Sequence, residues 1–464
     1  MKKRLLCLFL LSAQYCMATT WLVGPAKVYT KPSQVSTLVN DGDTVLIDAA
    51  VYIADVCYWG KNNLVLKGVG PGYAHLDANN TAYGGKAIWV IGGDNTLVEN
   101  IEFSKCTVVD KNGAGIRQEG INLHVNHCYF HHNENGILAG DNAGSKILIE
   151  KSEFGFNGYG DGLSHNLYIN HIDTLVFQYN YSHDAHVGHE LKSRAKTHYI
   201  LYNRISTELG TDSRNIDLPN GGLTVIMGNI LNQQQNSQNN NMIGYGLEGL
   251  ANAAFNEVYV INNTIINEKN VGSFFDLKIG TEKFKAYNNV CAGIGTFMTN
   301  TALVVDTMHN LINANINTLQ FQNAANYQYQ ISFPAYGTSP LFNAGINAGM
   351  AGSYSLLADK IYVHPQNFAS RCSNASIDIG AYEECAPNII SHTSEADGQI
   401  YPNPTHDMLY STLPVSSLKM FDMMGRQVAE TNNLPISFHL PSGIYLLQIE
   451  DKKGDFFYQK IQVD

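Results

Sequence analysis

The chain has 464 residues, of which only 15% are charged and 41 are glycine, and its formal net charge is −11. This composition disfavours long solvated helices and favours short strands joined by tight turns. The negative charge argues against a nucleic-acid-binding protein, and an anionic ligand would need a local cluster of basic residues. The length allows one large domain or two to three ordinary ones.

The first 18 residues have the pattern of a secretory signal peptide. Lys2, Lys3 and Arg4 form a basic start. An apolar run at residues 5–11 follows, and Ala18 is a small residue suited to cleavage. Because the apolar run is too short for a membrane span, we expect a secreted chain with no such span.

Cleavage after Ala18 leaves six cysteines. Cys372 and Cys385 lie close in sequence and could pair in an oxidising compartment. Cys106 and Cys128 occupy similar positions in the repeat described next, so they are either a second disulfide or buried thiols stacked in a core.

A loose internal repeat follows, with a spacing of about 25 residues. Each unit has a short strand of β-branched or aromatic residues, which is usually followed by an Asn and a second short strand. A period of this kind indicates a solenoid, because no single unit can bury its apolar face. An ordinary β-sandwich with Asn-rich turns is the alternative. The repeats lie at residues 63–67, 96–103, 123–130, 147–154, 174–181, 199–205, 223–230, 258–265 and 284–290.

This repeat resembles the right-handed parallel β-helix proteins, which include the pectate lyases, the chondroitinase-B and alginate-lyase group, and related epimerases. Residues 42–45 (GDTV) resemble the opening of a first coil, and residues 376–383 (SIDIGAYE) resemble a closing motif. The resemblance implies an all-β fold, a right-handed single-stranded parallel β-helix over residues 19–385. Asn at a coil corner suits a left-handed bend, and its amide can bond to the Asn of the next coil.

A polar linker at residues 386–398 separates this region from a small block at residues 399–464. The block carries IYPNP at 400–404, MFDMMGRQV at 420–428, LPSGIYLLQI at 440–449 and a short strand at 460–463. These ordered motifs resemble the C-terminal sorting domain of the type IX secretion system of Bacteroidetes. The resemblance implies a small β-sandwich that the secretion machinery reads and usually removes; a fibronectin-like module is the alternative.

Ten of the 16 histidines fall between His124 and His198, most densely at residues 183–194 (HDAHVGHELKSR). This stretch aligns with residues 163–170 (LSHNLYIN) at an offset of 24, which places His165 below His189. Leu167 and Leu191 are natural core residues of the two segments. Strand alternation then predicts which of their neighbours point outward. The predicted outward residues are Asn166, Tyr168, Glu190 and Lys192.

The next coil, at residues 213–218 (SRNIDL), would place Asn215 beside Glu190 and Asp217 beside Lys192. Arg194 and Arg214 make this part of an acidic chain locally basic. An anionic glycan is therefore the expected partner.

These residue types suit cleavage of an acidic polysaccharide by β-elimination. That reaction needs a base for the proton beside the uronate carboxylate, cations or donors for the carboxylate, and an acid for the leaving oxygen. The candidate catalytic residues are Lys192, Arg194, His189, Tyr168, His165 and Arg214. The candidate substrate-binding residues are His186, His183, Asn166 and Tyr245. The resemblance adds a candidate Ca²⁺ site formed by Glu190, Asn215 and Asp217.

Several alternatives stay open from the sequence. His183, His186 and His189 are spaced by three residues, which a transition-metal site could also use. The same scaffold could carry a glycoside hydrolase, for which Glu190 and Asp217 are the obvious carboxylate pair, or a uronate epimerase. A non-catalytic carbohydrate-binding or adhesion protein is the third reading. We expect a monomer in each case.

Overall fold

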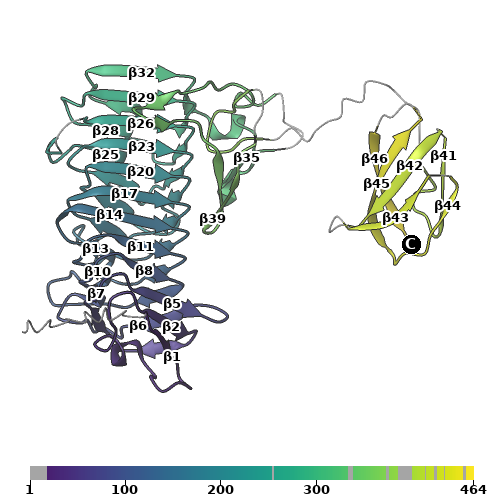
Figure 1. The fold of residues 1–464 in the computed structure, drawn as a ribbon. Coiled ribbons are helices and arrows are strands. Elements are labelled where there is room, and N and C mark those ends of the chain that lie inside the picture. The colour runs from purple at the N-terminus through teal and green to yellow at the C-terminus, as the bar shows by residue number, and fades with distance from the viewer. Residues whose placement is uncertain are drawn as a thin grey trace, which may run out of the picture. The chain divides into compact units, whose positions relative to one another are not determined.

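The computed structural model describes residues 18–252, 255–332, 338–372, 376–384, 400–412, 414–422, 426–432, 434–452 and 456–464. The chain divides into two compact units, Met1–Glu384 and Cys385–Asp464 (Figure 1). The predicted signal peptide, except its last residue, and the predicted linker lie outside the described residues. Within the described part of the chain, no helix is long and apolar enough to cross a membrane.

The first unit is a stack of coils, and each full coil contributes one strand to each of three parallel sheets (Figure 1). The first sheet contains β1 (Thr20–Val23), β2 (Thr44–Asp48), β5 (Val65–Val69), β8 (Thr96–Glu99), β11 (Leu123–Asn126), β14 (Asn142–Glu150), β17 (Ile172–Gln178), β20 (Thr197–Leu201), β23 (Leu223–Met227), β26 (Glu257–Ile261), β29 (Lys283–Tyr287) and β32 (Val304–Met308).

The second sheet contains β3 (Val51–Ile53), β6 (Ala74–Asp77), β9 (Ile101–Ser104), β12 (Tyr129–His131), β15 (Glu153–Gly155), β18 (Tyr181–His183), β21 (Arg204–Ser206), β24 (Ile230–Gln233), β27 (Thr264–Asn267), β30 (Val290–Gly293) and β33 (Leu311–Ala314). The third contains β4 (Cys57–Trp59), β7 (Ala87–Ile91), β10 (Ala114–Gln118), β13 (Asn135–Ala139), β16 (Leu167–Ile169), β19 (Leu191–Ser193), β22 (Ile216–Leu218), β25 (Asn241–Tyr245), β28 (Ser273–Leu277) and β31 (Thr296–Thr299). This architecture confirms the predicted right-handed parallel β-helix.

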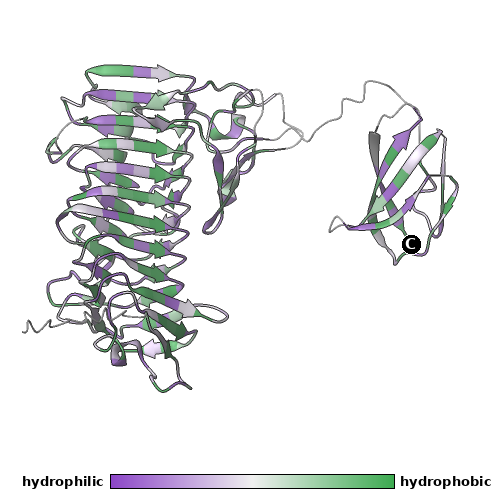
Figure 2. Ribbon diagram, viewed as in Figure 1, coloured by the Kyte–Doolittle hydropathy of each residue, from purple (hydrophilic) through white to green (hydrophobic). Residues whose placement is uncertain are grey.

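Equivalent side chains of successive coils stack inside the helix. Phe103, Phe130 and Phe154 are fully buried, and their neighbouring rings lie 4.9 Å apart and nearly parallel. Figure 2 shows hydrophobic and hydrophilic residues mixed along the strands, as expected when alternate side chains face the core and the solvent. The stack explains the repeat, since each coil buries its apolar face only against its neighbours.

A ladder of buried Asn side chains runs along the corner between the first and second sheets. The amide of Asn203 donates to Asn229, and the amide of Asn229 donates to Asn263, at 2.9 and 3.0 Å. The predicted Asn–Asn bonding is therefore confirmed. The left-handed residue of each corner is the one before the ladder Asn, such as Tyr202 with φ 54°.

The structure decides between the two alternatives for Cys106 and Cys128. Cys106 and Cys128 are free and buried, so they are core thiols. Cys372 is disulfide-bonded, whereas Cys385 lies outside the described residues.

The solenoid ends at β33, whereas the predicted end was residue 385. The strand–Asn–strand repeat stops there, and the following chain forms 3-10 turns and antiparallel hairpins instead. In the second sheet, outward Ile230, Ile266 and Val290 pack against Leu319 and Tyr329 of this segment. Figure 1 shows β35 and β39 beside the coils. The elements are η2 (Ile316–Thr318), β34 (Phe321–Asn323), η3 (Ala324–Asn326), β35 (Gln328–Ile331), β36 (Met350–Ala351), β37 (Tyr354–Ser355), β38 (Lys360–Val363) and β39 (Asn367–Ser370); one further turn, η1 (Pro32–Gln34), lies near the N-terminus.

The second unit consists of two small antiparallel sheets around its own core, which includes Leu409, Leu418, Leu447 and Ile461. It confirms the predicted C-terminal β-sandwich. One sheet contains β40 (Ile400–Tyr401), β41 (Met408–Ser411) and β44 (Ile436–Ser437). The other contains β43 (Gln427–Thr431), β42 (Val415–Phe421), β45 (Gly443–Asp451) and β46 (Phe456–Val463).

Candidate functional site

A polar row crosses the outer face of the third sheet. Tyr168 of β16 is in register with Lys192 of β19, and Lys192 is in register with Asp217 of β22. Both pairings agree with the register predicted from the sequence. Parallel strands keep such neighbours about 4.8 Å apart, so the three side chains act on one small region of surface.

Basic groups surround Asp217, the most buried member of this row. Its carboxylate lies 3.1 Å from Arg214 Nη1, 3.5 Å from His189 Nε2 and 3.7 Å from Lys192 Nζ. Burial raises the pKa of Asp217, and Arg214 and Lys192 oppose that rise. The carboxylate therefore holds the basic groups in place and partly neutralises them.

Arg194 is held by three partners just beyond β19. Its guanidinium donates to the Tyr168 hydroxyl at 2.9 Å, to Asn220 Oδ1 at 2.6 Å and to Glu248 Oε2 at 2.6 Å. Burial lowers the pKa of Arg194, but the contacts with Tyr168 and Glu248 outweigh it and leave the pKa raised. Arg194 therefore stays charged and suits binding of a carboxylate rather than proton abstraction.

His165 and His189 form the stacked pair that the sequence predicts, with ring centroids 4.9 Å apart and an angle of 16°. Nδ1 of His165 accepts the backbone N–H of His189 at 3.0 Å, and Nδ1 of His189 accepts that of Arg214 at 3.1 Å. Burial holds the pKa of both rings well below the usual range. Each ring is therefore neutral and carries its proton on Nε2.

Four predicted site residues are completely buried. Asn166, Glu190 and Asn215 each lie one residue before their strand, at the corner between the second and third sheets, where the alternation of β16, β19 and β22 does not extend. Asn166, Glu190, Asn215 and Tyr245 are all fully buried. The predicted outward placement of Asn166 and Glu190 is therefore wrong, and Tyr245 donates its hydroxyl to Gly222 O at 2.6 Å instead of reaching solvent.

The candidate Ca²⁺ ligands do not form a cation site. Glu190 accepts the N–H of Ala185 at 2.8 Å and the hydroxyl of Ser182 at 3.0 Å inside the coil. Asn215 donates to Asn232 O, and Asp217 already faces three basic groups. Glu190 and Asn215 point into the core, and Asp217 is already paired with cationic side chains. These three residues therefore do not fit Ca²⁺.

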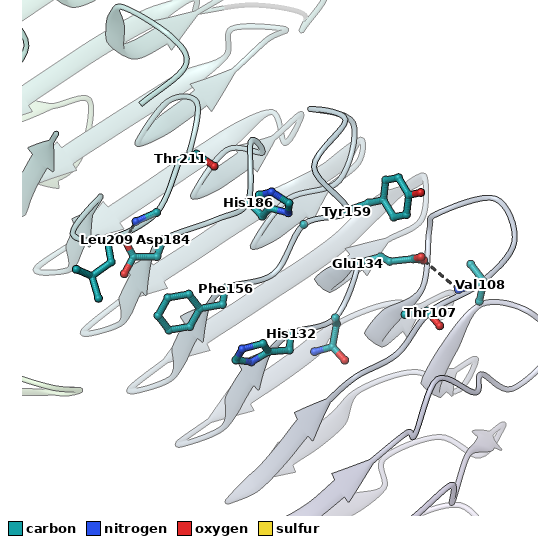
Figure 3. A pocket seen from close by; sticks show the side chains of 13 residues that line it. Thr107, Val108, His132, Glu134, Phe156, Tyr159, Asp184, His186, Leu209 and Thr211 are labelled. Atoms are coloured by element: carbon teal, nitrogen blue, oxygen red, sulfur yellow. Dashed lines mark hydrogen bonds between the residues drawn. The ribbon is translucent and has the colours of Figure 1, made fainter. Parts of the chain in front are cut away.

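A groove of about 750 Å³ is lined by residues from successive coils (Figure 3). It runs along the loops that lead from the second sheet into the third. Figure 3 shows the rings of His132, Phe156, Tyr159 and His186 along it. The lining residues are Thr107, Val108, His132, Asn133, Glu134, Phe156, Gly158, Tyr159, Asp184, His186, Leu209, Gly210 and Thr211.

The groove and the polar row are built on the same loops. The loop between β18 and β19 carries His186, which lines the groove, and His189, which contacts Asp217 of the row. The loop between β21 and β22 likewise carries Leu209, which lines the groove, and Arg214, which contacts Asp217.

The three closely spaced histidines do not converge on one point. Nδ1 of His183 lies 2.9 Å from Asp184 and its Nε2 lies 3.4 Å from Glu153. His186 instead lines the groove, whereas His189 faces Asp217. The transition-metal alternative for these three is therefore not supported by their arrangement.

Sequence reasoning did not connect Glu248 with the polar row. Its carboxylate lies 3.2 Å from Lys192 Nζ and 2.6 Å from Arg194 Nη2, and its side chain is 48% exposed. Glu248 lies 56 residues from Lys192, in a loop outside the coil repeat. Its glycine-rich neighbourhood was the one signal that a functional loop stood there.

The fold and the motifs together define a secreted right-handed parallel β-helix protein. Residues 399–464 match the family model of the secretion system C-terminal sorting domain. This domain directs handling by the type IX secretion machinery, and with it export to the cell surface or medium. No curated protein matches the chain in sequence.

The chain is similar in structure to pectate lyase Pel9A, whose crystal structure it matches with a TM-score of 0.51 and 14% identity over 79% of this chain and 96% of that one. A pectin methylesterase from Aspergillus niger matches with a TM-score of 0.30 and 9% identity over 68% of this chain and 90% of that one. The similarity to the pectate lyase supports the β-helix fold.

Proposed function

We propose that the chain is a polysaccharide lyase that cleaves an acidic, uronic-acid-containing glycan by β-elimination. The observation that carries the proposal is the place of Glu248. This exposed side chain puts a carboxylate between Lys192 and Arg194. A uronate carboxylate has the same charge and shape, so it can take this position when a glycan binds.

The groups of the polar row and the two arginines beside it then have defined tasks. Arg194 and Arg214 neutralise the uronate carboxylate, which makes the neighbouring carbon more acidic. Lys192 is the base assigned to take the proton from that carbon. The electron pair forms a carbon–carbon double bond, the bond to the leaving oxygen breaks, and the Tyr168 hydroxyl donates its proton to that oxygen. Tyr168 can donate because its oxygen already accepts the Arg194 Nε–H.

His165 and His189 act as positioning residues. Their stacked, buried rings accept the backbone N–H groups of His189 and Arg214 and so fix the start of β19 and of β22. The neighbouring groove, with His186 and Tyr159 on its wall, is the proposed place for the sugars that flank the cleaved bond. Aromatic rings at such a place supply stacking surface for sugar rings.

A hydrolase has less support on this surface. Its expected carboxylate pair was Glu190 and Asp217, and Glu190 is fully buried. A Ca²⁺ requirement stays an expectation for which we name no ligands. We also propose that the acting species is a monomer, made in a member of the Bacteroidetes with a signal peptide that ends at Ala18.

The proposal is tested by incubating the secreted protein with a panel of uronic-acid polymers, with and without a Ca²⁺ chelator. We expect an unsaturated product that absorbs ultraviolet light from at least one polymer. New reducing ends without that absorbance would indicate a hydrolase. Inverted uronate units without chain cleavage would indicate an epimerase, and binding without turnover would indicate a carbohydrate-binding protein.

A further inference from the structure

Three potential metal ligands converge on the outer face of the second sheet, away from the third-sheet row. His75 of β6 is in register with Glu102 of β9, and His131 of β12 reaches the same carboxylate from the next coil. Glu102 Oε1 lies 3.4 Å from His75 Nε2 and 2.9 Å from His131 Nε2. All three ligand atoms lie within 4.8 Å of one another.

We propose that His75, Glu102 and His131 bind one divalent transition-metal ion, with Zn²⁺ as the expected occupant. Two imidazoles and one carboxylate are a ligand set that suits Zn²⁺, with a water as the fourth ligand. Ligand atoms about 2.1 Å from a tetrahedral ion lie about 3.4 Å from each other. The two distances from Glu102 Oε1 are near this value, and the two imidazole nitrogens lie within 4.8 Å of each other.

The charges of the three groups favour a cation. Glu102 is an acidic side chain set between two imidazoles, whose Nε2 atoms both face its Oε1. The ammonium of the nearby Lys105 is paired with Asp77 at 2.6 Å.

Neighbouring side chains hold the two rings in position. His131 Nδ1 lies 2.8 Å from His132 Nδ1, and the His131 ring lies against Tyr129 with centroids 4.4 Å apart. His75 Nε2 lies 2.8 Å from the hydroxyl of Ser104. The contact with His132 is to the His131 nitrogen that does not face Glu102, and a hydrogen bond at that nitrogen fixes the orientation of a ligating histidine and strengthens metal binding.

A nearby pair shows what distinguishes this cluster. His124 Nε2 lies 2.9 Å from Glu150 Oε1, which is the same contact that His131 makes with Glu102. The second partner of Glu150 is the amide of Gln178, which cannot bind a metal as an imidazole does. The two sites thus share a His–carboxylate pair and differ in the second imidazole.

The test is titration of the metal-free full-length secreted protein with Zn²⁺ by calorimetry, and with Co²⁺ by visible absorption. We expect one tight site per chain, with a tetrahedral Co²⁺ spectrum. His131→Ala and Glu102→Gln should each weaken that binding at least about a hundredfold, beyond the usual effect of losing an outer partner. His124→Ala is the matched control and should bind as the parent does.

Glu102→Gln keeps the shape of the side chain, so it remains informative if His131→Ala fails to fold. Absence of a tight site in the parent would overturn the proposal. So would parental binding in either site variant, or equal loss in His124→Ala. The readouts do not depend on glycan cleavage and therefore stand apart from the proposed lyase activity.

Discussion

Lys192 contributes charge and position to the polar row, and little packing to the core. Its side chain is 13% exposed and pairs with Asp217 and Glu248 on the outer face. Lys192→Ala should lower turnover of the acidic glycan by about a hundredfold or more, as expected for loss of a general base. The free energy of unfolding should fall by less than about 1 kcal/mol, because the residue leaves no core cavity. Steady-state kinetics and urea unfolding measure the two effects.

Lys285 provides a matched control for this variant. Its side chain is also 13% exposed and lies 3.5 Å from a carboxylate, that of Asp306, on the first sheet. Lys285→Ala should therefore keep parental turnover. A folded Lys192→Ala variant with parental activity would remove Lys192 from the mechanism and direct attention to Tyr168 and Arg214.

Asp212 gives the fold a pH dependence of its own. Burial raises its pKa from 3.8 to about 7, although the hydroxyls of Ser237 and Thr207 oppose the rise. The folded chain therefore holds a proton that the unfolded chain has released between these two values. The stability contributed by this group is complete below about pH 4 and is lost as pH rises through about 7, at up to about 1.4 kcal/mol per pH unit.

Asp212→Asn should make the free energy of unfolding less dependent on pH in this interval. Urea unfolding from pH 5 to 8 compares the variant with the parent, and the parent should lose stability faster as pH rises. Parallel curves for the two proteins would show that Asp212 does not titrate as its burial implies.

At the scale of elements, the Asn ladder holds the coil corners together. Asn229 accepts the N–H of Asn203, donates to Ile200 O and donates to Asn263. Asn229→Ala should cost about 2 to 4 kcal/mol of unfolding free energy, because it leaves buried polar groups without partners. Urea unfolding measures the cost.

The control is Asn95, which lies outside this ladder in an exposed row of Asn side chains before the first sheet and bonds to Asn63 and Asn122 at 3.0 and 2.7 Å. Asn95 has φ 56°, so Asn95→Gly removes the side-chain bonds without backbone strain. It should cost less than about 1 kcal/mol, since water replaces the lost partners. Similar costs at both positions would argue against a stabilising role for burial of the ladder.

The elements also show how far sequence periodicity reaches. The repeat predicts the coils, and the offset of 24 residues predicts that Tyr168 adjoins Lys192 and that His165 stacks on His189. The alternation rule fails at Glu190, because a strand of three residues begins only at Leu191 and the corner before it turns inward. The rule applies inside a strand, and the sequence does not mark where so short a strand begins.

Loops of unequal length hide other neighbours. Glu248 reaches Lys192 across 56 residues, a separation that no single repeat offset predicts. His131 meets Glu102 because its ring reaches from one register row to the next. Such contacts depend on side-chain direction, which a repeat alignment does not contain.

At the scale of the whole molecule, folding and export belong to separate units. The β-helix unit Met1–Glu384 has its own core, and the sorting domain forms the other unit. A chain that ends at residue 390 should keep the thermal transition of the β-helix and fail to leave the cell. Circular dichroism and mass spectrometry of medium and cell fractions measure these outcomes, with the full-length chain as control. Equal amounts of the truncated chain in the medium would contradict a sorting role for the second unit.

The central claim is that the third-sheet row binds a uronate carboxylate and presents the adjacent carbon to Lys192. The most direct measurement is a crystal structure of Lys192→Ala with an oligosaccharide of the polymer that the parent cleaves. We predict that a sugar carboxylate contacts Arg194 or Arg214 and displaces Glu248, with the neighbouring carbon facing the position that the lysine amine occupies in the parent. An oligosaccharide bound elsewhere, with no carboxylate in contact with either arginine, would contradict the account.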